Sequence, residues 1–269
     1  MASSATIFSG SIPQLYDHYG EGLLFGPYAA DLVRRLSGLT EGHLLETAAG
    51  TGIVTRALAQ ALPAGVEIVA TDLNQPMLEH AAAKPDMGCV RCQQADALAL
   101  PFPDRAFDVV VCQFGIMFFP DRAAGMREAR RVLKPGGRFL FSVWDRLAEN
   151  PVTAAAVSGL AERYPSHPSW FMERTPHGYH APETIRADLR KAGFADAAIE
   201  TVRLTGHAAN AGSVAKMMCQ GSPMRGEIDA LDPGGLDAAT GAAAAAVAVR
   251  FGDGPLTVPL QALVIETAA

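Results

Sequence analysis

The sequence predicts an α/β fold built on a parallel sheet, and three observations support this. Between residues 43 and 144, short apolar runs alternate with segments of helical periodicity, which is the pattern of strands and helices that feed a parallel sheet. Clusters of glycine and proline separate many of these segments. The chain has 269 residues, 49% of them hydrophobic, which is enough for a single core.

The predicted elements follow one another in a regular order. The first is an amphipathic helix over Pro27–Leu36, which comes after a segment rich in glycine and tyrosine. The apolar runs that we expect to form parallel strands are His43–Glu46, Glu67–Asp72, Val90–Gln93, Phe107–Gln113 and Arg138–Trp144. The helices expected between them are Ile53–Ala61, Gln75–Ala82 and Arg122–Leu133, the last closed by the breaker cluster 134–137 before the next strand.

Beyond residue 144 the alternation stops. Residues 147–181 contain several prolines and aromatic residues, which indicates an insertion of helices and loops. The remaining expected elements are a helix over Pro182–Ala192, a strand near Ala198–Leu204, a second helical insertion over 207–252 with an alanine-rich helix around Ala238–Arg250, and a last strand over Leu256–Thr267. Pro259 indicates that this last strand begins at an edge or a bulge.

Composition excludes several classes of protein. The formal net charge of −6 argues against non-specific binding to nucleic acid or to an anionic membrane. The longest strongly apolar stretches, such as Ala238–Val249, hold about a dozen residues, whereas a membrane-spanning helix needs about 20. Four scattered cysteines and an amino terminus without a signal-peptide pattern favour the cytoplasm. Cys89 and Cys92 form a lone CxxC, so we expect no metal site.

Four polar positions follow successive strands. Leu44–Gly52 is a buried strand that ends in a glycine-rich turn and opens a helix, where free backbone N–H groups can bind a ligand. Asp72 ends the second strand, where a carboxylate can accept hydrogen bonds from both ribose hydroxyls. Asp96 follows the third strand and can accept a bond from an adenine amine. Gln113 ends the fourth, at the edge where open parallel sheets hold ligands.

These segments resemble the successive motifs of class I S-adenosylmethionine-dependent methyltransferases, in particular those of ubiquinone and menaquinone biosynthesis. The resemblance covers roughly residues 43–145 and rests on Glu46-Thr-Ala-Ala-Gly-Thr-Gly52, Ala-Thr-Asp72-Leu-Asn, Gln94-Ala-Asp96-Ala-Leu, Pro101-Phe-Pro-Asp-Arg-Ala-Phe-Asp108 and Arg131-Val-Leu-Lys-Pro-Gly-Gly137. It implies a Rossmann-like sheet of seven mostly parallel strands whose last strand is antiparallel, with helical cap insertions.

The resemblance also implies which parts of the chain bind the cofactor. The Glu46–Gly52 turn holds its methionine part, Asp72 its ribose, and Asp96 with Ala97 its adenine. The residues expected at the cofactor are Tyr16, Phe25, Glu46, Thr47, Ala48, Gly50, Thr51, Gly52, Asp72, Leu73, Met77, Ala95, Asp96, Ala97, Gln113 and Phe114. Ala48 stands where many members have glycine. Because alanine requires no positive φ and adds one methyl group, we expect binding to be retained.

Two other functions fit part of this pattern. An NAD-dependent oxidoreductase would use Asp72 as well, but the third glycine of its G-x-G-x-x-G fingerprint falls on Thr55. A module that binds the adenosyl ligand without transferring a methyl group would differ in lacking an open path from solvent to that group. The prediction is therefore a methyltransferase that uses S-adenosylmethionine, releases S-adenosylhomocysteine, and acts on a small, partly apolar molecule as a monomer or homodimer.

The acceptor side is less defined. Tyr16, Tyr19, His177 and His180 are candidates for a general base or a substrate contact, although each also fits a purely structural role. Trp144, Trp170, Phe171 and Met172 either line an acceptor pocket or simply pack, while Met117, Phe118 and Phe119 are expected in the core. We expect one domain over 1–269, with a helical cap over 1–42, a cofactor-binding core over 43–145, and lid insertions over 147–181 and 207–252.

Overall fold

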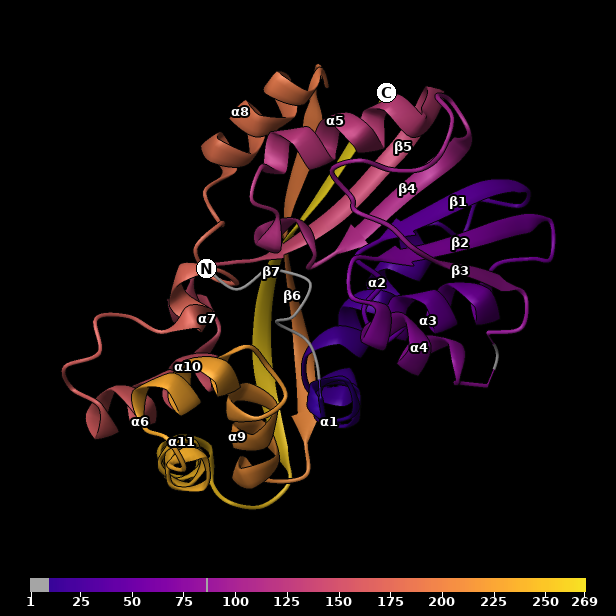
Figure 1. Cartoon of the computed structure of the whole chain (residues 1–269). Coiled ribbons are helices and arrows are strands. Elements are labelled where there is room, and N and C mark those ends of the chain that lie inside the picture. The colour runs from indigo at the N-terminus through magenta and orange to yellow at the C-terminus, as the bar shows by residue number, and fades with distance from the viewer. Residues whose placement is uncertain (1–9, 86) are drawn as a thin grey trace.

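The strands predicted from apolar runs pair into one seven-stranded sheet in the order β3-β2-β1-β4-β5-β7-β6 (Figure 1). A computed structural model describes residues 10–85 and 87–269. β1 to β5 pair in parallel, and β7 runs antiparallel to both β5 and β6, which confirms the predicted sheet. The strands are β1 (Gly42–Thr47), β2 (Val66–Asp72), β3 (Val90–Gln94), β4 (Phe107–Gln113), β5 (Leu133–Trp144), β6 (Ala197–Ala208) and β7 (Leu256–Ala268).

β5 begins earlier than the sequence predicted. Its first residue is Leu133, which pairs with Phe107, whereas the next pair joins Val109 to Arg138. The four residues between them, the expected breaker cluster 134–137, therefore form an excursion within the strand rather than a loop before it. Gly136 has a φ of 77°, a value that glycine adopts without strain and that explains how the chain returns to the sheet.

The expected edge at Pro259 is confirmed. Pro259 pairs with Thr205 of β6, but β5 contacts β7 only from Ala262 onward. The first residues of β7 thus have a partner strand on one side only, where a residue without a backbone N–H is tolerated.

Helices cover both faces of the sheet. α2 (Gly26–Arg35), α3 (Ile53–Ala61) and α4 (Gln75–Ala82) lie on one face, and α5 (Arg122–Val132) and α8 (Pro182–Ala192) lie on the other (Figure 1). This is the arrangement that right-handed crossovers between parallel strands produce when the strand order reverses at β1 and β4. The strands between these layers are hydrophobic on both faces, and Leu44, Leu45 and Val110 are fully buried.

The segment rich in glycine and tyrosine is helical. α1 (Ile12–Gly20) continues through a π-helical turn, η2 (Glu21–Phe25), directly into α2. Glycines allow close packing here, since a Cβ on Gly206 of β6 would lie 2.0 Å from the carbonyl oxygen of Leu23. A π-helical turn shifts the direction of the side chains that follow it, and such turns are common at functional sites.

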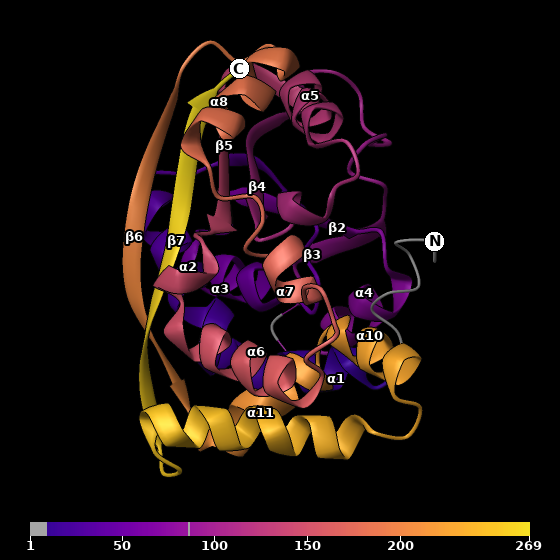
Figure 2. The ribbon, with the colours of Figure 1, turned by 90° about the vertical axis from the view of Figure 1, so that its left-hand side faces the viewer.

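The two segments predicted as insertions pack against each other although residues 182–206 separate them. α11 contacts α6 and α9, α10 contacts α7 and α9, and α1 contacts α9. Figures 1 and 2 show these helices gathered at one end of the long strands β6 and β7. The elements outside the main sheet layers are η3 (Ile116–Phe118), η4 (Leu147–Glu149), α6 (Pro151–Arg163), α7 (Phe171–Arg174), α9 (Ala211–Cys219), α10 (Met224–Leu231) and α11 (Leu236–Phe251).

No helix within the described residues combines the length and the apolar character that crossing a membrane requires.

A buried carboxylate connects α1 to the helices α3 and α4. Asp17 is only 6% exposed and forms a hydrogen-bonded ion pair with Lys84, next to α4. One of its oxygens lies 3.6 Å from a guanidinium nitrogen of Arg56 on α3. Burial alone raises the pKa of Asp17, but the hydrogen bond from Lys84 and the charges of Lys84 and Arg56 outweigh it, so this pKa is lower than usual.

We expect Asp17→Asn to lower the free energy of unfolding by about 1–2 kcal/mol at pH 7, since the cations partly reach solvent. A carboxyl whose pKa is lower in the folded state stabilises the protein above its unfolded pKa of about 3.9 and loses this effect as the pH falls through the folded value. Urea denaturation at pH 7 and pH 3 measures the difference in free energy of unfolding between the wild type and Asp17→Asn at each pH. The exposed Asp253→Asn is the control. If the difference at pH 3 is as large as at pH 7, the ionic explanation is contradicted.

Candidate functional site

A cavity of about 310 Å³ lies where the parallel strands end. Its walls come from the segments that follow β1, β2, β3 and β4, together with α1 and α7. The residues that line it are Tyr16, Ala48, Gly50, Asp72, Leu73, Asn74, Met77, Ala95, Asp96, Ala97, Leu98, Gln113, Phe114, Gly115, Phe118, Phe119, Pro120, Phe171 and Thr175. Most residues expected at the cofactor are in this wall.

The turn after β1 is hydrogen-bonded to the carboxylate of Asp72. The backbone N–H of Gly50 donates to Oδ2 of Asp72 over 2.8 Å, and the backbone N–H of Asn74 donates to Oδ1 over 2.8 Å. Asp72 thus fixes both its own turn and the glycine turn. Burial raises its pKa, although these hydrogen bonds act in the opposite direction. The carboxylate lies in the cavity wall.

Ala48 adopts a left-handed conformation, with a φ of 54°, which the sequence analysis did not anticipate. The expectation that alanine needs no positive φ was wrong, because the chain keeps here the backbone path that glycine favours. A left-handed conformation costs an L-residue about 1–2 kcal/mol. The methyl group also needs room, which Gly115 provides: a Cβ on Gly115 would lie 2.4 Å from that of Ala48.

Glu46 lies beneath the glycine turn rather than in the cavity wall. Its carboxylate is 2% exposed and accepts a hydrogen bond of 2.6 Å from the Thr55 hydroxyl. Burial raises the pKa of Glu46 to about 8, despite that bond, so the carboxyl is mostly protonated at neutral pH. Glu46 is absent from the cavity wall, so its expected role at the cofactor stays a prediction. Three more residues expected at the cofactor, Thr47, Thr51 and Gly52, also lie outside the wall of this cavity.

The loop after β3 supplies Asp96 and Ala97. The carboxylate of Asp96 is exposed, and Oδ1 accepts the backbone N–H of Leu98 over 2.8 Å. Farther along, Arg131 donates to the carbonyl oxygens of Leu100 and Phe102 over 2.9 and 2.8 Å. The arginine of the motif at 131–137 therefore holds in place the loop that presents Asp96 to the cavity.

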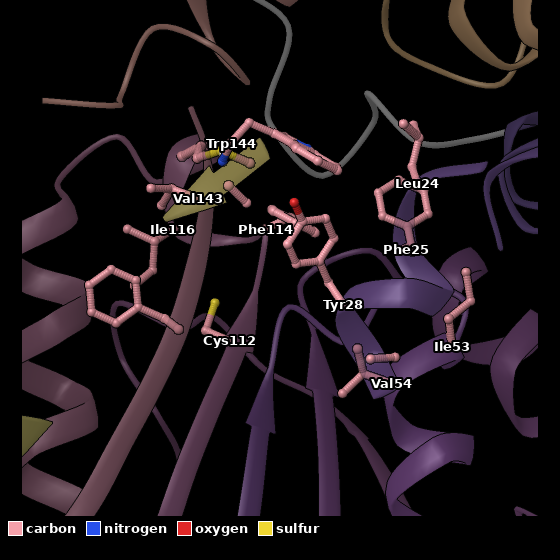
Figure 3. Packing of buried hydrophobic residues seen from close by; sticks show 14 of the residues in the cluster. Leu24, Phe25, Tyr28, Ile53, Val54, Cys112, Phe114, Ile116, Val143 and Trp144 are labelled. Carbon is pink, nitrogen blue, oxygen red and sulfur yellow. Dashed lines mark hydrogen bonds between the residues drawn. The ribbon is translucent and has the colours of Figure 1, made fainter. Parts of the chain in front are cut away.

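The end of β4 forms an aromatic floor. Phe114 stacks on Trp144 with ring centroids 3.9 Å apart, and Tyr28 meets both rings edge-on (Figure 3). Phe114 has a φ of 55°, the second left-handed non-glycine residue in the wall. Gln113 donates to the carbonyl oxygen of Phe25 over 3.0 Å and so fastens the π-helical turn to the strand end. Backbone strain of this kind is often found at functional sites.

A second, smaller cavity of about 50 Å³ adjoins the first. The two share Tyr16, Phe114, Phe118 and Phe171. The residues that line the second are Tyr16, Leu24, Phe25, Phe114, Met117, Phe118, Trp144, Thr153, Phe171, Met172, Pro176, His177, Met217, Met218, Ser222 and Pro223. Its wall contains no Asp, Glu, Lys or Arg among the described residues and is rich in aromatic rings and methionines.

Several aromatic residues lie differently from their expected places. Phe25 lines the second cavity and stacks on Tyr16 with centroids 4.5 Å apart. Met117, Phe118 and Phe119 were expected in the core. Met117 is buried there as expected and also lines the second cavity. Phe119 packs against the core and lines the first cavity, whereas Phe118 is 36% exposed and lines both. Trp170 is buried outside both walls.

The four candidates for acceptor chemistry divide into two pairs. Tyr16 lines both cavities, and His177 lines the second. Tyr19 and His180 line neither: the Lys216 ammonium lies 5.9 Å from the Tyr19 ring, and Nδ1 of His180 donates to the His177 carbonyl oxygen over 2.8 Å. Burial, with smaller contributions from Asp72 and Asp17, raises the pKa of Tyr16, so this hydroxyl keeps its proton at neutral pH.

Sequence reasoning missed some of the wall. Asn74, two residues after Asp72, could have been found because it belongs to the same turn. Pro120 and Thr175 carried no such signal, since Thr175 lies in an insertion without a recognised motif. Among the described residues, no cluster of three or more histidine, cysteine or acidic side chains could hold a metal ion.

Comparisons with known proteins agree with this arrangement. Residues 45–141 match the family model described as a methyltransferase domain. The chain is 34% identical over 168 residues to a demethylmenaquinone methyltransferase of Thermus thermophilus, covering 56% of this chain and 74% of that protein. It is 36% identical over 139 residues to a ubiquinone/menaquinone biosynthesis C-methyltransferase of Geobacter sulfurreducens, covering 49% of this chain and only 54% of the relative.

Solved structures share the fold. A phosphoethanolamine N-methyltransferase of Haemonchus contortus, solved with phosphomonomethylethanolamine and S-adenosylhomocysteine, superposes with a TM-score of 0.63 at 16% identity. The superposition covers 100% of this chain and 61% of that one.

The contact between Ala48 and Gly115 generates a testable prediction. We expect Gly115→Ala to lower the free energy of unfolding by about 1–3 kcal/mol, because the new methyl group would lie 2.4 Å from the Cβ of Ala48 and 2.7 Å from Sγ of Cys112. Adding Ala48→Gly should restore part of that loss. Ala48→Gly alone should change stability little, since relief of about 1–2 kcal/mol of strain is offset by about 0.5–1 kcal/mol of unfolded-state entropy. Urea denaturation compares the four proteins, and a double variant no more stable than Gly115→Ala would refute the contact.

Proposed function

The chain belongs to the S-adenosylmethionine-dependent methyltransferases of the ubiquinone/menaquinone-biosynthesis type, and from this membership we propose that it methylates a small, partly apolar acceptor. The observation that carries the proposal is the pair of adjoining cavities. The first is lined by the glycine turn and by two carboxylates that follow successive strands, and the second is apolar. Such a pair fits a polar cofactor beside an apolar acceptor.

The first cavity fits the adenosyl group. Asp72 has acceptor capacity beyond its bonds to Gly50 and Asn74, which suits ribose hydroxyls. Oδ1 of Asn74, in the same wall, is buried and lacks a hydrogen-bond partner within the described residues. A buried acceptor of this kind is normally satisfied, and a ligand hydroxyl would do so. We infer that Asp96 accepts a hydrogen bond from the adenine amine and that the backbone at Ala48–Gly50 binds the methionine part.

When bound, S-adenosylmethionine supplies an electrophilic methyl group on a positively charged sulfur and leaves as S-adenosylhomocysteine. Tyr16 and Phe114 line both cavities and Phe25 lines the second, and the faces of such aromatic rings attract a cation. The chain's main task is to align the acceptor and to exclude water, and such positioning can lower a barrier by about 7–11 kcal/mol.

The acceptor cavity indicates an uncharged, partly apolar molecule. A charged group would lose its hydration there without gaining a paired charge, because the described wall contains no Asp, Glu, Lys or Arg side chain. Part of the cavity wall comes from the two insertions. Residues 147–181 contribute α6, α7 and the turn after α7, and residues 207–252 contribute α9. We infer that these segments act as a lid, and the described part of residues 1–42 as a cap, on one catalytic domain.

The second cavity also bears on the alternative of a module that binds the ligand without transfer. Such a module needs no space beside the cofactor, whereas this chain keeps an apolar cavity that shares four residues with the cofactor cavity. Methyl incorporation from labelled S-adenosylmethionine into metabolite extracts distinguishes the two. Absence of incorporation across extracts, with cofactor bound, would favour the module.

The cofactor assignment is tested by isothermal titration with S-adenosylhomocysteine. We expect tight binding to the wild type and a loss of about 1.5–3 kcal/mol in Asp72→Ala, the value of hydrogen bonds to a charged group. Because Asp72 also holds the glycine turn, thermal melting should confirm that this variant is folded. The exposed Asp253→Ala is the control. Unchanged affinity in Asp72→Ala would place the ribose elsewhere.

A further inference from the structure

The second cavity holds one side chain whose neutral form offers a nitrogen lone pair. The polar side chains in its described wall are Tyr16, Thr153, His177 and Ser222. Tyr16 keeps its own proton, as its raised pKa indicates. The Ser222 hydroxyl donates to the carbonyl oxygen of Met218 and accepts the backbone N–H of Met224. Of these groups, only the neutral imidazole of His177 offers a nitrogen lone pair that can accept a hydrogen bond.

His177 is held by hydrogen bonds at three of its atoms. Its backbone N–H donates to the carbonyl oxygen of Met172 over 3.0 Å, and its carbonyl oxygen accepts Nδ1–H of His180 over 2.8 Å. Its ring atom Nδ1 lies 2.6 Å from the carbonyl oxygen of Asp145. The turn is tight as well, because a Cβ on Gly178 would lie 2.2 Å from the carbonyl oxygen of Arg174. The imidazole therefore has a fixed position.

The contact with Asp145 decides the tautomer. A carbonyl oxygen can only accept, so Nδ1 carries the proton and Nε2 carries the lone pair of the neutral ring. A buried network holds Asp145: its backbone N–H donates to the carbonyl oxygen of Gln261, and the Gln261 amide donates to its carboxylate over 2.7 Å. Asn150 in turn bonds both the N–H and the carbonyl of Gln261. The end of β5 thus orients the histidine.

We propose that Nε2 of His177 accepts a hydrogen bond, and then the proton, from a hydroxyl or neutral N–H group of the acceptor. The inference rests on the proposed function. In this step the bond between the acceptor heteroatom and hydrogen breaks, and its electron pair stays on the heteroatom, which bonds to the methyl carbon while the carbon–sulfur pair stays on sulfur. The proton moves to Nε2 and later to water.

The surroundings of His177 suit this cycle. Burial lowers its pKa to about 4, the neighbouring His180 contributes in the same direction, and the hydrogen bond to Asp145 opposes both. The ring is therefore neutral at pH 7, free to accept, and it returns a proton readily after each turnover. Asp145 and His180 are the titratable groups that act on it. Trp144, whose ring centroid lies 6.1 Å away, forms the adjoining wall.

The inference predicts a selective effect on acceptors that carry a hydrogen-bond donor. With S-adenosylhomocysteine bound, we expect His177→Phe to weaken binding of p-cresol at least five-fold and to leave binding of its methyl ether, 4-methylanisole, unchanged. His177→Gln should retain most of the p-cresol affinity, because its side-chain oxygen can accept. Affinities are measured by NMR titration. The ¹⁵N-histidine spectra of the wild type should show the Nδ1–H tautomer. The Nε2 resonance should shift on addition of p-cresol and not on addition of 4-methylanisole.

Other outcomes would overturn the inference. Equal weakening of both probes would indicate a packing role, and unchanged p-cresol binding in His177→Phe would exclude the hydrogen bond. A wild type that binds neither probe, or that carries its proton on Nε2, would refute it as well. S-adenosylhomocysteine affinity is the separate control, since His177 lies outside the wall of the cofactor cavity. Failure of the wild type to bind this compound would contradict the proposed function instead.

Discussion

The functional end of this molecule depends on the two hydrogen bonds by which Asp72 joins neighbouring turns. Because β1 and β2 are adjacent and parallel, their carboxyl ends lie at the same edge, and the Asp72 carboxylate can accept the N–H of Gly50 and that of Asn74. The glycine turn cannot move without breaking a bond to a buried charge, a loss that is costly. The two hydrogen bonds of Asp72 therefore fix the shape of this part of the cavity wall.

The surrounding chain accommodates strain so that the backbone can approach the cavity. Ala48 and Phe114 both adopt left-handed conformations, and a π-helical turn precedes α2. Each departure has a local compensation: Gly115 leaves space for the methyl group of Ala48, and Trp144 stacks on Phe114. Gln113 fastens the π-helical turn. The resulting wall is rigid, which is what alignment of two reacting groups requires.

The two cavities are lined mainly by different parts of the chain. Turns at the ends of adjacent strands line the first, and their order in the sheet fixes their spacing. The second is enclosed by helices of the two insertions, with the end of β5 and the π-helical turn. Four residues belong to both walls, and Phe171 and Thr175 bring the insertion 147–181 to the first cavity as well.

The sequence by itself determined the strands, most helix bounds, and the residues around Gly50, Asp72, Asp96 and Gln113, because periodicity and motif spacing are local properties. Tertiary structure alone decided the positive φ of Ala48, the position of Glu46 beneath the turn, and the meeting of Tyr16 with His177 in one wall. These features depend on how segments far apart in the sequence pack against one another. No pattern within either insertion specifies which partner it will contact, and so the second cavity became visible only in the folded chain.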